Sequence, residues 1–403
     1  MRTLGYALLI WTLSMACQPK KTDSPTLGFE QIMVIEKNGI NVEEPFLHVT
    51  KEGKVLLSWI EKDNFSAAFK FRRYDQGKWS EENTIAKGDN WFINWADYPQ
   101  ISAFSDGTLI AAFLEKNGEG KFAYEIKISL SQNGKEWSKP FTVHDDGTET
   151  EHGFVSFSPW GEHMLITWLD GRNTGAAHDH SSHGHHGQMN LRAALISSSG
   201  EKLQDWLLDD RVCDCCQTSS AIGPNGPLVV FRDRSEEEIR DTGLIKWENG
   251  QWSKTQAINM DLWKIASCPV NGPKIATKDK TVAVAWYTAT KDQPEVKITF
   301  SKDGGENFST PIKLGLGQTI GRIGLTLWNE KEAFACWMEE NKIYLRKVYD
   351  SGRMENPNMI AESSEKRSSG FPQISNDGEQ IWLAWTDDSQ EKKKIIVGKY
   401  QPK

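Results

Sequence analysis

Residues 99–113 read PQISAFSDGTLIAAF, and this stretch decides the fold of the chain. Apolar and polar residues alternate on both sides of Ser105-Asp106-Gly107, and a turn of this kind between alternating runs predicts a β-hairpin. The hairpin recurs along the chain, and each copy closes on an aromatic residue 48 to 63 positions after the one before. The closing residues are Trp59, Phe113, Trp168, Phe231, Trp286, Trp337 and Trp385. Such a period is typical of a repeat architecture.

A second hairpin follows the first in each copy, so each unit supplies four antiparallel strands, the content of one β-propeller blade. The last unit has three strands and ends at residues 394–400, and residues 29–35 can supply the fourth. Pairing these two segments closes the ring and removes the exposed sheet edges. The sequence therefore predicts an all-β, seven-bladed β-propeller of four-stranded blades, a single domain over residues 29–403.

Residues 1–17 have the pattern of a targeting segment. A positive residue precedes an apolar run over residues 4–16, which is too short to cross a bilayer as a helix, and small residues precede Cys17. This pattern resembles the lipobox of bacterial lipoproteins, with Ser14 where leucine is usual; an ordinary cleaved signal peptide is the alternative. Residues 18–28 are polar and suit a flexible tether. We expect a lipid on Cys17 and a place in the bacterial cell envelope, facing the outer membrane or the periplasm.

The composition and the net charge limit the classes of partner that the chain is expected to bind. Hydrophobic residues make up 38% of the chain and charged residues 25%, which is typical of a soluble globular domain. The formal net charge is −8 and no basic block occurs, so we expect no nucleic-acid partner. We expect a monomer that reaches the membrane through its lipid anchor.

Several motifs resemble those of one known family. Residues 301–308, SKDGGENF, fit the Asp-box pattern Ser-x-Asp-x-Gly-x-x-aromatic, and residues 131–137 are a degenerate copy. Five further segments carry the resemblance: NWADYP at 94–99, WLDGR at 168–172, DRVCDCCQT at 210–218, FRDRS at 231–235 and CPVNGP at 268–273. The chain resembles the sialidase/BNR-repeat propellers, and more closely a group of exported bacterial proteins labelled exo-α-sialidase-like.

This resemblance implies a six-bladed propeller as the alternative fold and a sialidase-type glycoside hydrolase as one function. Family sialidases hold a carboxylate with three arginines, and Arg172, Arg232 and Arg322 match that role, with Asp97 as the catalytic acid. The Phe/Tyr-Arg-Ile-Pro motif of the family's first arginine is missing, because residues 44–47 read EPFL. Enzymatic activity therefore stays open.

The repeat sorts the loops onto two faces. Short turns within hairpins lie on one face, and the long connections lie on the other, where a rigid scaffold usually carries its function. We expect the site on the loop-rich face, around the central funnel. Arginines beside aromatic rings suit carboxylate or sugar ligands, although the same Arg–Asp pairs can lock neighbouring loops together. The candidate ligand-binding residues are Trp95, Asp170, Arg234, Arg240 and Trp263.

Four cysteines fall in two neighbouring loops of this face: Cys213, Cys215, Cys216 and Cys268. In an exported protein they predict disulfides, one of them bridging the cluster to Cys268. A second bridge within the cluster is awkward, which favours the alternative of a thiolate site for copper(I) or zinc. Cys336 lies in an apolar strand and is expected to be a buried free thiol.

A histidine run lies in the long loop after Arg172. His178, His180, His183, His185 and His186 bind zinc, copper or nickel if they act together, and otherwise belong to a solvated insertion. Our leading prediction is a lipid-anchored propeller that binds a glycan or a metal at its loop-rich face. A sialidase-type hydrolase and a protein-assembly platform are the alternatives.

Overall fold

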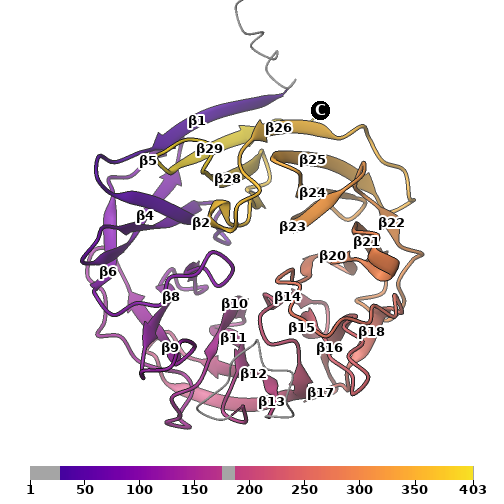
Figure 1. Cartoon of the computed structure of the whole chain (residues 1–403), viewed down its shortest axis with the longest axis horizontal. Helices are drawn as coiled ribbons and strands as arrows, with labels where there is room; N and C mark the ends of the chain where they lie inside the picture. The colour runs from indigo at the N-terminus through magenta and orange to yellow at the C-terminus, as the bar shows by residue number, and fades with distance from the viewer. Residues whose placement is uncertain (1–27, 175–186, 403) are drawn as a thin grey trace, which may run out of the picture.

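The computed structural model describes residues 28–174 and 187–402. Within them, seven antiparallel sheets stand side by side around a central axis (Figure 1). The predicted seven-bladed propeller is confirmed, and the six-bladed alternative is wrong. The extra blade relative to a sialidase comes from the repeat itself, because every copy of the hairpin pattern forms its own sheet. No helix in the described part of the chain is long and apolar enough to cross a membrane.

The first three blades run in chain order. Blade 1 contains β2 (Asn41–Val49), β3 (Val55–Lys62), β4 (Ala67–Asp75), β5 (Lys78–Trp79) and β6 (Asn83–Gly88). Blade 2 contains β7 (Gln100–Ala103), β8 (Leu109–Lys116) and β9 (Tyr124–Ser131), and an isolated bridge between Ile128 and Phe141 marks its outer edge. Blade 3 contains β10 (His152–Trp160), β11 (His163–Asp170), β12 (Met189–Ile196) and β13 (Lys202–Val212).

The next three blades follow the same order. Blade 4 contains β14 (Ser219–Gly223), β15 (Gly226–Arg232), β16 (Thr242–Glu248), β17 (Gln251–Trp252) and β18 (Gln256–Asn259). Blade 5 contains β19 (Lys274–Lys278), β20 (Thr281–Thr288), β21 (Glu295–Ser301) and β22 (Ile312–Lys313). Blade 6 contains β23 (Thr319–Asn329), β24 (Glu332–Glu339), β25 (Lys342–Tyr349) and β26 (Asn358–Glu362). Two short 3₁₀ helices lie in loops, η1 (Thr290–Asp292) and η2 (Arg367–Ser369).

Blade 7 joins the two ends of the chain. Its inner strands are β27 (Gln373–Asn376), β28 (Ile381–Asp387) and β29 (Lys394–Tyr400), and its outer strand is β1 (Phe29–Ile35). Strand β1 pairs antiparallel with β29, so that Phe29 lies opposite Tyr400 and Ile35 opposite Ile395 (Figure 1). The predicted closure by the N-terminal strand is confirmed. Closure matters because an unpaired β29 would present a row of unsatisfied backbone groups.

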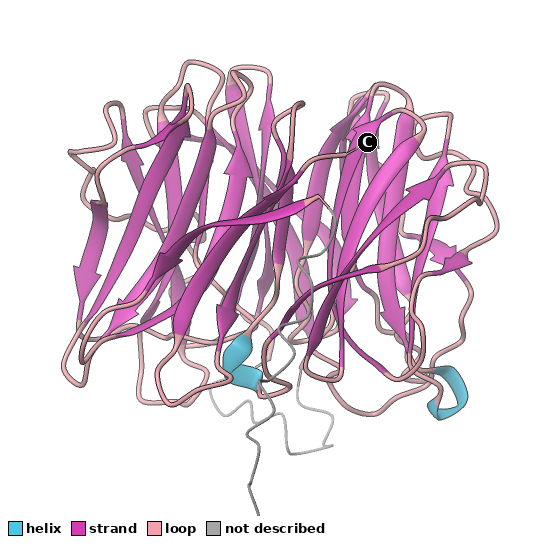
Figure 2. Ribbon diagram, turned by 90° about the horizontal axis from the view of Figure 1, so that it is seen from above, coloured by secondary structure: helices cyan, strands magenta, loops and turns pink. Residues whose placement is uncertain are grey.

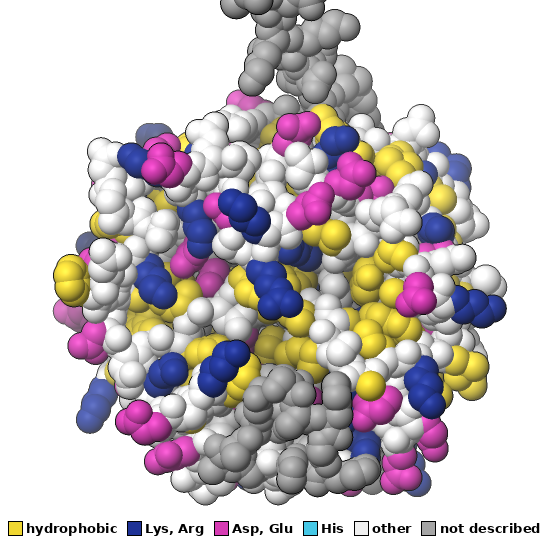
Figure 3. Space-filling view, viewed as in Figure 1, with side chains coloured by type: hydrophobic (Ala, Val, Ile, Leu, Met, Phe, Trp, Pro, Cys, Tyr) yellow, Lys and Arg dark blue, Asp and Glu magenta, His cyan; other side chains and the backbone are white. Residues whose placement is uncertain are grey.

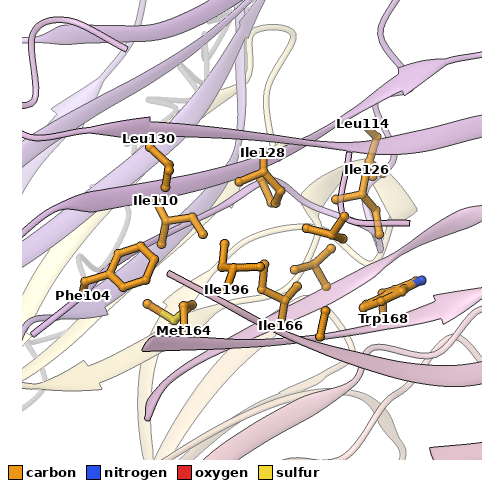
Figure 4. Close-up of a cluster of buried hydrophobic side chains, with 14 of the residues drawn as sticks. Phe104, Ile110, Leu114, Ile126, Ile128, Leu130, Met164, Ile166, Trp168 and Ile196 are labelled. Carbon is orange, nitrogen blue, oxygen red and sulfur yellow. The ribbon is translucent and has the colours of Figure 1, made fainter. Parts of the chain in front are cut away.

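The hydrophobic core lies between neighbouring blades. Figure 4 shows Ile110 and Ile128 of blade 2 facing Met164, Ile166 and Ile196 of blade 3. Each second strand is buried on both faces, which explains why it reads as a nearly continuous apolar run in the sequence. Each blade thus covers its neighbours, and the core is divided among the interfaces between blades.

A hydrogen bond that recurs in several blades holds the C-terminal end of the second strand. The indole N–H of Trp168 donates to the carboxylate of Asp170 at 2.8 Å. The same bond joins Trp59 to Glu61 at 3.1 Å and Trp337 to Glu339 at 3.0 Å. Since a buried indole N–H needs an acceptor, the carboxylate two residues later satisfies the closing tryptophan in these three blades, whereas Trp286 donates to Asp261 instead. Asp170 therefore belongs to the architecture of the blade.

The two faces of the ring differ as predicted. In the side view, the two short helices lie on the same side of the ring (Figure 2). The connections between second and third strands and between blades all end on that side, which is the loop-rich face. The Asp-box lies in a turn of the opposite face, where the Asp303 carboxylate accepts the N–H groups of Glu306 and Asn307 at 3.1 and 2.9 Å. The box thus has a structural role.

Candidate functional site

The mouth of the central channel on the loop-rich face is crossed by the loop that enters blade 2. The Trp95 ring stacks on Phe371 of the blade 7 entry, with centroids 5.6 Å apart. The Gln217 amide donates to the carbonyl oxygen of Ala96 at 2.6 Å, and Lys274 donates to the Tyr98 hydroxyl at 2.9 Å. The loop is thereby joined to blades 4, 5 and 7. The open funnel expected from the sequence is filled by protein at these positions.

Two cavities follow the channel away from this loop. One of about 150 Å³ lies among the innermost strands and is lined by residues of all seven, such as Phe46, Ser220 and Gln373. The other, of about 940 Å³, opens on the face of the short turns, between residues such as Lys51, Lys278 and Asp377. Figure 3 shows the loop-rich face itself, where Lys and Arg side chains surround a more apolar centre.

The three predicted clamp arginines do not form a clamp. Arg232 is 1% exposed and donates to the carbonyl oxygens of Arg240, Asn271 and Tyr287 at 2.7 to 3.0 Å. Arg322 donates to the Ser369 hydroxyl and to three carbonyl oxygens of residues 365–370. Arg172 binds two aspartates. None of the three guanidinium groups shares a partner with another, so each holds a different set of loops.

The two predicted tryptophans pack against these arginines. The Arg232 guanidinium lies 5.3 Å from the Trp263 ring centroid, and Trp263 is 5% exposed. The Arg322 guanidinium lies 5.0 Å from the Trp95 ring, and Arg367, which is exposed, lies 6.0 Å from the same ring. Trp263 is therefore an internal packing residue, whereas Trp95 is half-buried at the surface.

Asp97, the predicted catalytic acid, is part of a buried hydrogen-bonded chain. The Tyr124 hydroxyl lies 3.1 Å from the Asp97 carboxyl and 2.7 Å from that of Glu151, and the Phe154 N–H donates to Asp97 at 2.7 Å. Burial raises the pKa of Asp97 to about 8, and the charge of Glu151 adds to the rise. Because a hydroxyl has one proton to donate, a protonated Asp97 completes the chain.

This chain of groups is closed to ligands. Asp97, Tyr124 and Glu151 are 4%, 1% and 3% exposed. A group that acts on a substrate must touch it, and these three side chains are covered by protein. The described geometry thus gives Asp97 and its partners a structural position.

The four cysteines of the loop-rich face converge. Cys213 and Cys216 are 1% exposed, and their sulfur atoms lie 3.6 Å apart. Cys213 and Cys215 each contact the thiols of the other three, so that Cys268 of the blade 5 entry joins the cluster. All are free thiols, as is the buried Cys336. The disulfides predicted for this cluster are absent from the described residues.

Charged groups surround the sulfur atoms. Arg240 donates to the sulfur of Cys213 at 3.1 Å and to that of Cys268 at 3.7 Å. Arg240 also pairs with Glu238 at 2.7 Å, and Arg234 pairs with Glu238 at 2.7 Å and with Asp214 at 3.3 Å. Arg234 and Arg240 were predicted as ligand-binding residues, and the structure places them together beside the thiols.

This environment separates the pKa values of the thiols. Burial opposes the ionisation of Cys213, but thiol hydrogen bonds and the charge of Arg240 outweigh it and hold its pKa well below the usual range. The neighbouring thiols raise the pKa of Cys215, and burial raises that of Cys216 to about 12. Cys213 is therefore the thiol of this group whose ionisation the surroundings favour most clearly, and the thiolate is the form that binds metals.

The separation of two of the sulfur atoms suits a tetrahedral metal ion. Four sulfurs about 2.3 Å from a zinc ion lie about 3.8 Å from one another. The measured separation of 3.6 Å between Cys213 and Cys216 is close to that edge and far from a disulfide bond. The donor set is thiolate alone, which suits soft ions such as zinc and copper(I).

The sequence did not indicate the acidic residues that hold the arginines beside the thiols, or a neighbouring cluster of histidine and aspartate side chains. Asp214 and Glu238 orient the arginines, and Asp214 stands inside the CDCC motif itself, which could have suggested it. His144 and Asp146 were not singled out, because their link to His152 and Arg172 exists only in the folded loops. The five histidines of the run, His178 to His186, and Cys17 lie outside the described residues.

Comparisons with known proteins give the fold. No protein-family model and no curated protein matches the sequence. Among solved structures, a polysaccharide lyase, Uly1, aligns with a TM-score of 0.55 at 10% identity, over 89% of this chain and 90% of its own. An α-L-arabinofuranosidase, Arb93A from Fusarium graminearum, aligns with a TM-score of 0.51 at 10% identity, over 94% of this chain and 98% of its own.

A third structure is a protein of unknown function from Dyadobacter fermentans, with a TM-score of 0.50 and 11% identity over 93% of this chain and 100% of its own. At such identities the likeness extends to the backbone architecture and no further. This chain is a seven-bladed β-propeller that shares its fold with a polysaccharide lyase and an arabinofuranosidase.

Proposed function

We propose that this chain is an exported metal-binding β-propeller that holds one zinc ion between the sulfur atoms of Cys213, Cys215, Cys216 and Cys268. The observation that supports it is the convergence of four free thiols from two loops on one place. Three of them come from the entry of blade 4 and one from the entry of blade 5. A bound ion therefore ties neighbouring blades together.

The surroundings suit such an ion. A zinc ion with four thiolates carries excess negative charge, which has to be balanced inside the protein. Arg240 supplies a positive charge and N–H donors to two of the sulfurs, and Glu238 holds its guanidinium in place. Cys213 and Cys216 are buried, whereas Cys215 and Cys268 are partly exposed and give the ion a route to solvent. Four protein ligands favour retention of the ion over hydrolytic chemistry.

Metal content of the exported protein tests this proposal. Native mass spectrometry is expected to show one zinc ion per chain and four reduced cysteines at the site. Cys213→Ser is expected to lose the ion, because it removes the most readily ionised ligand. Cys336→Ser is the matched control, since Cys336 is equally buried in blade 6 and remote from the cluster. A protein with two disulfides and no bound zinc or copper contradicts the proposal. Bound copper(I) in place of zinc would keep the proposed site and change only the identity of the ion.

A second candidate function is the binding of an acidic glycan on the loop-rich face. The half-buried Trp95 ring and the exposed Arg367 beside it offer a stacking surface and a charged donor. Uly1 and Arb93A, which share the fold, are named for activities on glycans. Titration with uronic-acid and sialic-acid oligosaccharides tests this binding. Trp95→Ala is expected to weaken it at least tenfold, and equal affinity in the variant contradicts it.

We propose further that residues 1–17 direct export and that Cys17 carries the lipid. Mass spectrometry of the membrane-extracted protein is expected to find a chain that begins at a diacylated Cys17. Cys17→Ala is expected to abolish membrane association and leave the propeller folded. A mature N-terminus elsewhere contradicts the anchor.

A further inference from the structure

A second cluster of metal-binding side chains lies where the chain enters blade 3. The Asp146 Oδ2 atom lies 3.1 Å from His152 Nε2 and 3.5 Å from His144 Nδ1. One ligand atom from each of the three residues lies within 4.8 Å of the other two. The side chains of His144, Asp146 and His152 are 4%, 8% and 0% exposed. This cluster is built from nitrogen and oxygen donors, unlike the thiolate site of blade 4.

These separations match the edges of a coordination polyhedron. Nitrogen and oxygen ligands about 2.1 Å from a tetrahedral zinc ion lie about 3.4 Å apart. The two measured separations from Asp146, 3.1 and 3.5 Å, bracket that value. The Asp146 oxygen and either histidine nitrogen are therefore close enough to bind the same ion.

The second atoms of the ligands are already engaged. His152 Nδ1 lies 3.1 Å from the carbonyl oxygen of Thr150, which accepts only from an N–H, so Nε2 is the nitrogen left for a ligand bond. Asp146 Oδ1 accepts the backbone N–H of Thr148 at 3.0 Å, which leaves Oδ2 facing the histidines. The His144 ring stacks on that of His152, with centroids 4.0 Å apart. Because an imidazole binds a metal ion in its own ring plane, one of the two rings has to turn out of this stack for both to bind the same ion.

Negative groups surround the histidines. His152 Nε2 lies 3.1 Å from Asp146 Oδ2 and 3.7 Å from Asp170 Oδ1. Arg172 holds Asp170 through both oxygens and makes it a supporting group.

We propose that His144, Asp146 and His152 form a zinc site with three protein ligands and one open coordination position. The Arg172 guanidinium, 3.2 Å from Asp146 Oδ2 and partly exposed, lies at the accessible edge of the site. The open position distinguishes it from the closed thiolate site, because it admits a water molecule or an anionic group of a ligand. The two sites occupy neighbouring blades of the same face and are independent of each other.

Cobalt(II) titration tests the proposal, with the histidine run removed by replacing residues 175–186 with a Gly/Ser linker. Cobalt bound by thiolates gives an intense sulfur-to-metal charge-transfer band, whereas nitrogen and oxygen ligands give only weaker visible d–d bands. We expect one equivalent of cobalt to bind with the weaker d–d bands of nitrogen and oxygen ligands. Zinc is expected to displace it. The titration is done on Cys213→Ser, so that strong d–d bands of cobalt held by thiolates do not overlap this readout.

Three variants identify the ligands. His152→Ala and Asp146→Asn are each expected to weaken the cobalt signal of the nitrogen and oxygen site at least tenfold. His163→Ala is the matched control, since His163 lies at the opposite end of blade 3, at the start of β11. Asp146→Asn keeps the shape of the side chain and guards against a fold defect, which circular dichroism monitors. Absence of the d–d signal in the loop-replaced protein, or a signal unchanged by both ligand variants, overturns the proposal.

Discussion

At the scale of single residues, the role of each candidate depends on its burial and contacts in the fold as well as on its residue type. Asp97, Asp170 and Arg232 have the chemistry of catalytic or binding groups, yet their side chains are buried and bonded to the protein. Cys213, by contrast, has a pKa held well below its usual range by the thiols of Cys215 and Cys216, its neighbours in the sequence, and by Cys268 and Arg240. Cys268 and Arg240 come from other loops, so the sequence shows only part of this environment. Residue type alone therefore ranks these candidates in the wrong order.

Asp97 gives a prediction on pH. Its pKa is about 8 in the folded protein and about 3.9 in an unfolded chain. The stability associated with its proton is present in full below pH 4 and is lost as the pH rises toward 8, by up to about 1.4 kcal/mol per pH unit. Asp97→Asn has no such proton to lose, so its stability relative to the natural protein is expected to increase over this window.

Urea unfolding at pH 5 and pH 7.5 measures the effect on Asp97. Asp279→Asn, in an exposed turn with φ of 50°, is the control and is expected to follow the natural protein. Parallel pH profiles for Asp97→Asn and the natural protein would mean that Asp97 is ionised in the fold.

Arg232 gives a prediction on stability. Its guanidinium satisfies carbonyl oxygens from three loops, so Arg232→Met leaves buried acceptors unpaired and is expected to cost about 3 kcal/mol. Arg211→Met, which removes a half-exposed pair with an exposed glutamate, is expected to cost little. Thermal unfolding of both variants decides the point. A variant of Arg232 with unchanged stability and impaired ligand binding would restore its role in a clamp.

At the scale of elements, the loops that enter the blades are the functional units of this protein. In blades 1, 3 and 6, the closing tryptophan and the carboxylate two residues later hold the end of the second strand. From these ends the chain passes to loops that contact loops of other blades. Gln217, for example, accepts from the N–H of Gly272 and donates to Ala96. The thiolate cluster depends on this close contact between the entries of blades 4 and 5.

Gly272 gives a prediction on the metal site. A Cβ atom at position 272 would lie 2.0 Å from the carbonyl oxygen of Gln217. Gly272 and Gln217 belong to the two loops that carry the cysteines, so the backbones of these loops touch here. Gly272→Ala is therefore expected to push Cys268 away from the other cysteines, to lower zinc occupancy, and to cost about 2 kcal/mol of stability. Gly317→Ala is the control, because nothing lies within 4 Å of its Cβ position. Full zinc occupancy in Gly272→Ala would exclude a shared site between these loops.

At the scale of the whole molecule, the ring is stable because it has no open edge. Strand β1 closes blade 7, so the first and last parts of the chain hold each other in place. The core is divided among the interfaces between neighbouring blades, and opening one interface exposes apolar surface on both sides. Closure is thus a property of the entire chain.

Deletion of β1 gives a prediction on cooperativity and assembly. A chain that begins after residue 35 exposes the edge of β29, and it is expected to unfold at a clearly lower temperature and to associate through that edge. A chain that begins at residue 28 keeps the strand and is the matched control. Calorimetry and light scattering compare the two. A monomeric, equally stable protein without β1 would mean that blade 7 is complete with three strands.

The sequence by itself determined the number of blades, the closing strand and the face that carries the long loops. These follow from local patterns, because alternation, turn residues and the spacing of the closing aromatics act within one hairpin at a time. The position of the Asp-box in a turn was also readable, since its Asp and Ser bind their own turn. The residues of the candidate site could be named as types, but not as a group.

Only the tertiary structure decided which of those residues meet. The sequence favoured disulfides for the four cysteines, and the fold instead brings their thiols into contact with one another beside Arg240 without a disulfide. It named three arginines as a clamp, and the fold binds each to a different set of carbonyl or carboxylate groups. The physical reason is that these contacts join loops of different blades. The length and direction of those loops are set by packing around the ring, which no local pattern encodes.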